Sequence, residues 1–285
     1  MVMYNRFGEV FHMDDLQTFK NFLLEEEKSP LTIQKYLRDV SKFLHWLSSR
    51  ELTKGETRAY KAWLTEQYTP ASVNSMLSAL NRYLDFISRE DCKVKFIRIQ
   101  REVFYPVEKE LTREEYQRLL RAAKDDTRLC LLMQTICSTG IRVSEHRYIT
   151  VEAVRQQKAT VRCKGKIRTV LLPGKLCKAL QAYIRQNRIR SGSVFVGNSG
   201  KPLDRSRIWA QMKKLCRTAK VQTEKVFPHN LRHLFARMYY AMEKDIVRLA
   251  DILGHSSINT TRIYTKESGD IHRRQIEKIP LLFIT

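Results

Sequence analysis

Two amphipathic helical patterns, each beginning at a hydroxyl residue followed by proline, constrain the first part of this chain most strongly. Ser29-Pro30 begins one pattern and Thr69-Pro70 begins the other. A Ser or Thr side chain can cap a helix, and proline suits the first helical position. Apolar residues then recur at helical spacing, so that each segment presents one apolar face. These residues are Ile33, Tyr36, Leu37, Val40, Phe43, Leu44 and Leu47 in the first, and Val73, Met76, Leu77, Leu80, Leu84 and Ile87 in the second. The pattern predicts a helical domain over residues 1–92.

A second domain is predicted over residues 109–285. Thr112 and Glu115 have the spacing of a capping box at the start of a helix. Another helical pattern covers about 127–138. Residues 159–163 and 167–172 are rich in β-formers and flank a short Lys-Gly-Lys turn, which predicts a hairpin. The chain is therefore expected to be mainly α-helical, with a small β-hairpin in the second domain.

The two predicted domains are separated by a basic segment, residues 93–108. Its first part, KVKFIRIQR, alternates loosely between basic and apolar residues. This pattern is typical of an extended interdomain linker, and equally of an edge strand with one solvated face. The sequence leaves both interpretations open.

The charge of the chain indicates a polyanionic partner. Lys and Arg number 52 and Asp and Glu number 30, for a formal net charge of +22. Residues 1–100 carry a net charge of +2 and residues 101–285 a net charge of +20. A basic excess of this size is the electrostatic signature of nucleic-acid binding. The second domain is expected to hold the stronger phosphate-facing surface.

The sequence predicts a cytoplasmic protein with no membrane partner. Its N-terminus lacks the apolar core of a signal peptide, and no later stretch approaches the length of a membrane span. Six cysteines show neither CxxC pairing nor metal-ligand spacing, which predicts reduced packing residues.

Several residues that could bind a phosphate group lie in the second domain. Arg142 follows Gly140 at the expected end of a helix, and His229 and Arg232 share one face of a first helical turn. His229 and His233 also have the spacing of a zinc site. Asn230 occupies the position where a zinc hydrolase needs a general-base Glu, so no metal site is predicted.

Taken together, four segments resemble the tyrosine recombinase, or phage integrase, family, including its simple Xer-like or transposon-type members. They are TGIRVSE around Arg142, HNLRH at 229–233, LGH ending at His255, and Tyr264 after them. The resemblance covers most of the chain, and the joint order of the segments is more specific than any one of them. It implies a two-domain DNA clamp, in which a helical core-binding domain precedes a mixed catalytic domain.

The resemblance also implies roles for individual residues. Arg142 and Arg232 would be the two phosphate-binding arginines, His229 the first histidine, His255 the second histidine-or-tryptophan position, and Tyr264 the nucleophile. Lys164 resembles the family's hairpin lysine. Lys166 is the alternative, because this turn is shorter than the common family version. His146 departs from the family pattern, which has an aliphatic residue there, and this puts local packing in doubt.

The implied chemistry uses side chains alone. Two guanidinium groups stay protonated and can neutralise the charge of a phosphodiester, so neither metal nor ATP is expected as a cofactor. A tyrosine phenol has an ordinary pKa of about 10, and His229 would help Tyr264 to lose its proton. His255 would donate to a phosphate oxygen. Lys164 would protonate the departing 5′ oxygen, leaving a 3′-phosphotyrosyl link.

The resemblance further implies a homotetramer that joins two double-stranded DNA recombination sites of a mobile element or replicon through a Holliday junction. The apolar end, residues 279–285, would either pass to a neighbouring protomer or fold back on its own domain. Two other functions remain alternatives. A type IB topoisomerase uses similar chemistry but rejoins the original strand, and a DNA-binding regulator would use the same fold without cleavage.

Overall fold

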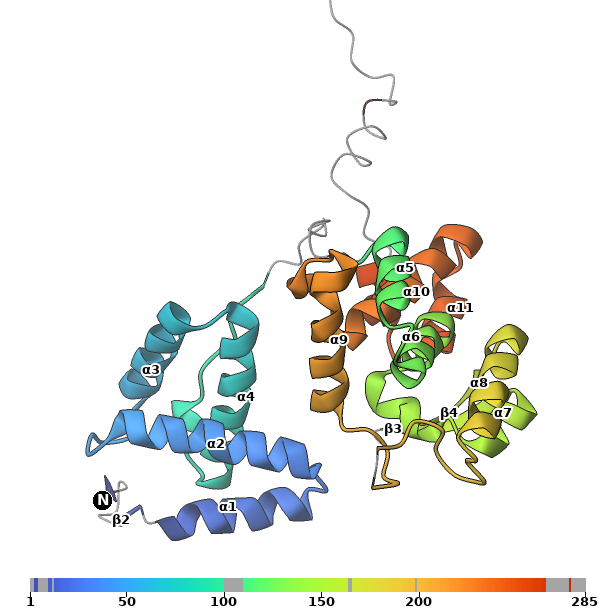
Figure 1. Ribbon diagram of the computed structural model, residues 1–285. Coiled ribbons are helices and arrows are strands. Elements are labelled where there is room, and N and C mark those ends of the chain that lie inside the picture. Colours follow the sequence, from blue (N-terminus) through green and yellow to red (C-terminus); the bar gives the residue numbers. More distant parts are fainter. Residues whose placement is uncertain are drawn as a thin grey trace, which may run out of the picture. The chain divides into compact units, whose positions relative to one another are not determined.

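The structure, a computed structural model, describes residues 3–4, 10–11, 13–99, 110–163, 166–197, 199–264 and 277. The chain divides into two compact units, Met1–Arg101 and Glu102–Thr285, each of which is described by itself (Figure 1). The expectation of a mainly helical chain with a small hairpin in the second part is confirmed. Within the described ranges, no helix has both the length and the apolar character needed to cross a membrane.

The described residues of the first unit form four helices: α1 (Met13–Glu25), α2 (Pro30–Leu47), α3 (Lys54–Gln67) and α4 (Pro70–Phe86). A short strand pair, β1 (Met3–Tyr4) and β2 (Val10–Phe11), precedes them, and a 3-10 turn, η1 (Glu90–Cys92), follows. The strand pair is not anticipated from the sequence. The apolar faces of α2 and α4 meet in the core, as the periodicity predicts.

The two helix starts differ in their capping. The Ser29 hydroxyl accepts a hydrogen bond from the Thr32 backbone N–H at 3.2 Å, which confirms the predicted cap. The prediction of the same cap at Thr69 is wrong, because that side chain makes no capping bond and instead donates to the Ser72 hydroxyl at 3.0 Å. Both helices nevertheless begin at proline, which needs no N–H partner.

The basic segment after Cys92 is held against α4 by two asparagine side chains. The amide of Asn81 bonds both backbone groups of Val94, at 2.9 and 3.0 Å. Asn74 bonds both backbone groups of Ile97 in the same way, at 2.9 and 2.7 Å. Side chains of α3 also hold this segment, since Lys61 donates to the Lys95 carbonyl at 2.7 Å. Residues 93–99 therefore form a non-helical stretch that is bound to side chains of the first unit and belongs to no strand.

The second unit contains the predicted capping box and hairpin. Thr112 and Glu115 bond each other's backbone N–H groups at the start of α5 (Arg113–Ala122). Strands β3 (Lys158–Cys163) and β4 (Lys166–Leu171) pair antiparallel, from Lys158↔Leu171 to Cys163↔Lys166. The remaining elements are α6 (Thr127–Thr139), η3 (Val143–Tyr148), α7 (Val151–Gln156), α8 (Gly174–Gln186), α9 (Arg205–Ala219), η4 (Thr223–Lys225), α10 (Pro228–Glu243), α11 (Ile246–Leu253), α12 (Ile258–Thr261) and η5 (Arg262–Tyr264).

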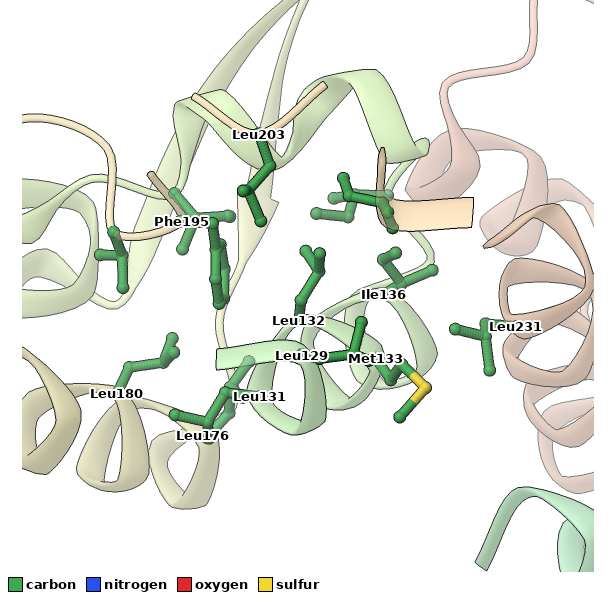
Figure 2. Close-up of a cluster of buried hydrophobic side chains, with 14 of the residues drawn as sticks. Leu129, Leu131, Leu132, Met133, Ile136, Leu176, Leu180, Phe195, Leu203 and Leu231 are labelled. Atoms are coloured by element: carbon green, nitrogen blue, oxygen red, sulfur yellow. The ribbon is translucent and has the colours of Figure 1, made fainter. Parts of the chain in front are cut away.

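The core of the second unit is organised around α6, which packs against α8 and α10 (Figure 1). Figure 2 shows side chains of α6 surrounded by those of α8, by Leu231 of α10, and by Phe195 and Leu203 from the segment before α9. Buried apolar contacts on several sides fix the axis of α6. The position of its C-terminal end, where Arg142 follows, is fixed as a result.

Candidate active site

The end of α6 brings the two predicted phosphate-binding arginines together. Gly140 ends the helix in the left-handed conformation, with φ at 66°, and a Cβ there would lie 2.5 Å from the Phe235 ring and 2.9 Å from Leu253. Neither the conformation nor the space admits a side chain. The Gly140 carbonyl accepts a hydrogen bond from Arg232 Nη1 at 2.5 Å. The turn that leads into Arg142 therefore also holds the second arginine.

Arg232 extends from α10 into the protein interior, with 1% of its surface exposed. Its Nη2 donates to the Leu253 carbonyl at 2.8 Å and to His255 Nε2 at 2.9 Å. Burial lowers the pKa of the guanidinium to about 10, and the positive charge of Arg142 adds to this effect. Interaction with Tyr264 acts in the opposite direction and raises the pKa. Arg232 therefore remains a fixed positive charge at neutral pH.

Arg142 is held by Glu145, a carboxylate that is 1% exposed. Glu145 accepts from the Arg142 backbone N–H at 2.7 Å and from its Nη1 at 3.1 Å. Its second cationic partner is Arg168 of β4, whose Nη2 donates at 2.7 Å. The Arg142 side chain is 36% exposed, so the guanidinium is anchored on one side and open to solvent on another.

Sequence reasoning missed both Glu145 and Arg168 as site residues. The spacing of Arg142 and Glu145 matches a capping box, and this signal could have identified the carboxylate. Arg168 gives no comparable local signal, because a single arginine in an alternating strand is ordinarily a solvated residue. Its partners lie 23 and 84 positions away in the chain.

His255 is held between Arg232 and a buried hydroxyl. Its Nδ1 lies 2.8 Å from Thr261 Oγ1, and Thr261 has no exposed surface. Arginine can only donate, so His255 Nε2 accepts from Arg232 and Nδ1 carries the proton that bonds Thr261. Burial, followed by the charge of Arg232, lowers the pKa of His255 to about 4. In this arrangement His255 orients Arg232, and donation to a phosphate oxygen would require the ring to leave that partner.

Tyr264 lies at the centre of a small aromatic and apolar cluster, with 3% of its surface exposed. Its ring meets the His233 ring edge to face, with centroids 4.6 Å apart, and stacks on His255 with centroids 5.9 Å apart. The hydroxyl interacts with Arg232. The predicted nucleophile is therefore next to the predicted phosphate-binding group but covered by neighbouring side chains.

His229 lines an open pocket of about 880 Å³ together with both arginines. Its pKa is lowered by burial first and then by the positive charges of Arg232, Arg142 and Arg205. A neutral imidazole can accept a proton, as the predicted role requires. The other residues lining the pocket include Arg205 and Trp209 of α9. The pocket thus presents cations and a proton acceptor to whatever binds there.

The sequence also points to Lys164, Lys166 and His146. Lys164 lies outside the described residues, and Lys166 is placed only as the first residue of β4. His146 takes up the aliphatic position: it is 2% exposed, its Nδ1 bonds the Val143 carbonyl at 2.5 Å, and Nε2 has no hydrogen-bond partner among the described residues. Within the same ranges, no group of three or more His, Cys, Asp or Glu is arranged to hold a metal ion.

The free energy of unfolding is expected to fall as the pH is lowered from about 6.5 to about 4. Burial lowers the pKa values of His233 and His255 to about 4 from an ordinary value of 6.5. Above pH 6.5 both histidines are neutral in the folded and in the unfolded chain, so the stability is fully present. Below it the unfolded chain binds protons that the folded chain does not, so stability is lost. Urea unfolding across this range measures the slope. The variant His233→Phe keeps a ring beside Tyr264 and should reduce the slope; an unchanged slope would contradict the explanation.

Comparison with known proteins places both units. Residues 109–269 match the phage integrase family, and residues 16–91 match the phage integrase N-terminal SAM-like domain. Tyrosine recombinase XerA of Pyrococcus furiosus is 30% identical over 278 residues, which cover 94% of each chain. XerD of Vibrio cholerae is 28% identical over 256 residues, which cover 82% of this chain and 85% of the relative.

Solved structures show the same fold. A crystal structure of XerA recombinase matches with a TM-score of 0.53 and 27% identity, covering 95% of this chain and 99% of that one. A post-cleavage complex of XerH site-specific recombinase with its difH substrate has a TM-score of 0.70 and 19% identity, covering 87% and 80%. The matched family covers more than half of the residues, and the match covers 80% or more of each relative's length. The chain therefore belongs to the phage integrase family and is a tyrosine recombinase.

Proposed function

We propose that this recombinase cleaves and rejoins double-stranded DNA at specific sites through a covalent bond to Tyr264. The observation that carries the proposal is the convergence of Tyr264, Arg232 and His255 in direct contact, with Arg142 and His229 beside them. Two protonated guanidinium groups can offset the charge that develops on a phosphate during attack by a phenol oxygen.

The proposed reaction conserves bond energy. The Tyr264 oxygen attacks the scissile phosphorus, its proton passes to His229, and the bond from phosphorus to the 5′ oxygen breaks. Lys164 gives a proton to that oxygen, which leaves a 3′-phosphotyrosyl link. The 5′ hydroxyl of a partner strand then attacks the link and releases Tyr264.

The finer assembly is also part of the proposal. Residues 1–92 would bind the core site, 93–108 would link the domains, and 109–285 would carry catalysis, with the two domains clamping the DNA. Four protomers would exchange strands in pairs through a Holliday junction. This arrangement is supported by the structure of a lambda integrase tetramer bound to a Holliday junction. That structure matches with a TM-score of 0.70 and 17% identity, covering 88% of this chain and 76% of that one. Action on a mobile element, the cytoplasmic location and exchange of the tail, residues 279–285, stay predictions. The tail lies outside the described residues.

The two alternative functions are less well supported. The relatives named above are recombinases, and nothing in the comparison favours a type IB topoisomerase. A purely regulatory protein would have no use for a tyrosine packed against Arg232 and two histidines. Covalent attachment distinguishes it from an enzyme, since a regulator shifts DNA without becoming linked to it.

A nicked substrate tests the proposal directly. The target site is first located by nuclease protection of DNA flanking the encoding gene. A nick placed beside the cleavage position lets the short released fragment diffuse away, so that rejoining is prevented and the phosphotyrosyl complex accumulates. Protein-linked DNA on a denaturing gel is the expected result. Binding without any linked product would reject the enzymatic function.

The choice between the two hairpin lysines can be made with a modified leaving group. A 5′-thio leaving group needs no proton, so it should restore cleavage to Lys164→Ala if Lys164 is the general acid. Lys166→Ala is the matched control and should show no comparable rescue. Rescue of Lys166→Ala instead would exchange the roles of the two lysines.

A further inference from the structure

Arg168 of β4 connects the β3–β4 hairpin to the segments that hold both phosphate-binding arginines. Its side chain is 15% exposed. The guanidinium donates through Nη2 to Glu145 at 2.7 Å and through Nη1 to the Ile252 carbonyl at 2.6 Å. A Cβ on Gly254 would lie 2.4 Å from Arg168 Cδ, so the backbone of the α11 cap passes directly over the side chain.

Each partner of Arg168 belongs to a segment that also bonds a phosphate-binding arginine. Glu145 holds the backbone and the guanidinium of Arg142. The carbonyl after that of Ile252 belongs to Leu253 and accepts from Arg232. One side chain therefore fixes both segments that set the directions of the two arginines.

We propose that Arg168 is a positioning residue for cleavage, which holds Glu145 and the end of α11 so that Arg142 and Arg232 face one phosphate. The proposal rests on the proposed function. It also gives the hairpin, which contains Lys164 between its strands, a direct connection to the groups that bind the phosphate.

The chemistry of the contact favours arginine at this position. Its planar guanidinium reaches two acceptors at once in a fixed geometry, whereas a lysine ammonium is a single compact charge on a flexible stem. Arg168 also shares the Glu145 carboxylate with Arg142. Without Arg168, Arg142 would be the remaining cationic partner of that buried carboxylate among the described residues. The carboxylate would then draw the Arg142 guanidinium away from a bound phosphate.

The test compares Arg168→Met with Arg155→Met, an exposed arginine of α7 that controls for loss of one positive charge. Cleavage is measured on the natural phosphodiester and on a methylphosphonate, which replaces one charged oxygen with a methyl group and so depends less on the guanidinium groups. We expect Arg168→Met to bind DNA normally and to cleave the phosphodiester on the order of 100-fold more slowly, the effect of a small misplacement. The defect should be much smaller on the methylphosphonate. Arg155→Met should behave as wild type on both.

A purely structural role would slow both substrates equally, and that result would overturn the proposal, as would unchanged rates on both. The double variant with Arg142→Ala should lose less activity than the product of the two single defects, because part of the effect of Arg168 acts through the Arg142 guanidinium. If Arg168→Met fails to fold, Arg168→Lys serves instead, because lysine keeps the charge but can no longer bond both acceptors of Arg168. It should also slow cleavage of the phosphodiester more than cleavage of the methylphosphonate. Wild-type protein that forms no linked DNA would instead reject the proposed function itself.

Discussion

The variant Tyr264→Phe is expected to bind its recombination site as tightly as wild type and to form no protein-linked DNA. The substitution removes only the oxygen that would attack phosphorus. It keeps the ring that packs against His233 and His255. One interaction with Arg232 is lost, so the fold should change little while the chemistry stops. A gel shift measures binding, and a denaturing gel with the nicked substrate measures covalent product.

Tyr240→Phe is the matched control, because Tyr240 packs against the same cluster and loses the same atom. That variant should retain cleavage. A normal yield of covalent complex from Tyr264→Phe would remove Tyr264 as the nucleophile. Loss of DNA binding by Tyr264→Phe would show instead that its hydroxyl matters for the structure of the site.

The parts of the fold and site that depend on local pattern could be predicted from the sequence. Helix starts at Ser29 and Thr112, the hairpin, and the helix that ends at Gly140 all follow from residues within a few positions of one another. The order of the motifs also predicted which histidines, arginines and tyrosine belong to one site. Their contacts in the structure support that grouping.

The parts that depend on partners distant in sequence could not be predicted. Arg168 bonds acceptors from two other segments, and nothing in its own strand indicates that its side chain is partly buried. Thr261 becomes a site residue only because α12 places its hydroxyl against His255. Burial also changes the expected chemistry: the role of His255 as a donor to phosphate does not follow once Nε2 accepts from Arg232. Such roles are set by packing, which spacing does not reveal.

Substitution of either phosphate-binding arginine by methionine is expected to slow cleavage by about 100- to 1000-fold, the usual cost of losing one charge-stabilising donor. The two variants should also differ in stability. The variant of the buried Arg232 should be more stable than the variant of the more exposed Arg142. For Arg232, the lowering of the pKa from 12.5 to about 10 means that the folded environment disfavours its charge by roughly 3 kcal/mol. Methionine removes that penalty. It also leaves the Gly140 and Leu253 carbonyls without their donor, at about 1–3 kcal/mol each. These effects largely cancel.

For Arg142, the loss of an ion-pair partner outweighs the gain from removing the charge. Its side chain is already 36% exposed, so methionine gains little from the loss of charge, while the Glu145 carboxylate, 1% exposed, loses one of its two cationic partners. A hydrogen bond to a buried charge is worth about 1.5–3 kcal/mol, so Arg142→Met should be the less stable variant. Urea unfolding of both variants, measured beside single-turnover cleavage, tests the ordering. If Arg232→Met is instead the less stable of the two, the buried guanidinium is a net stabilising element. The cancellation at Arg232 between the cost of its buried charge and its hydrogen bonds to the two carbonyls would then be wrong.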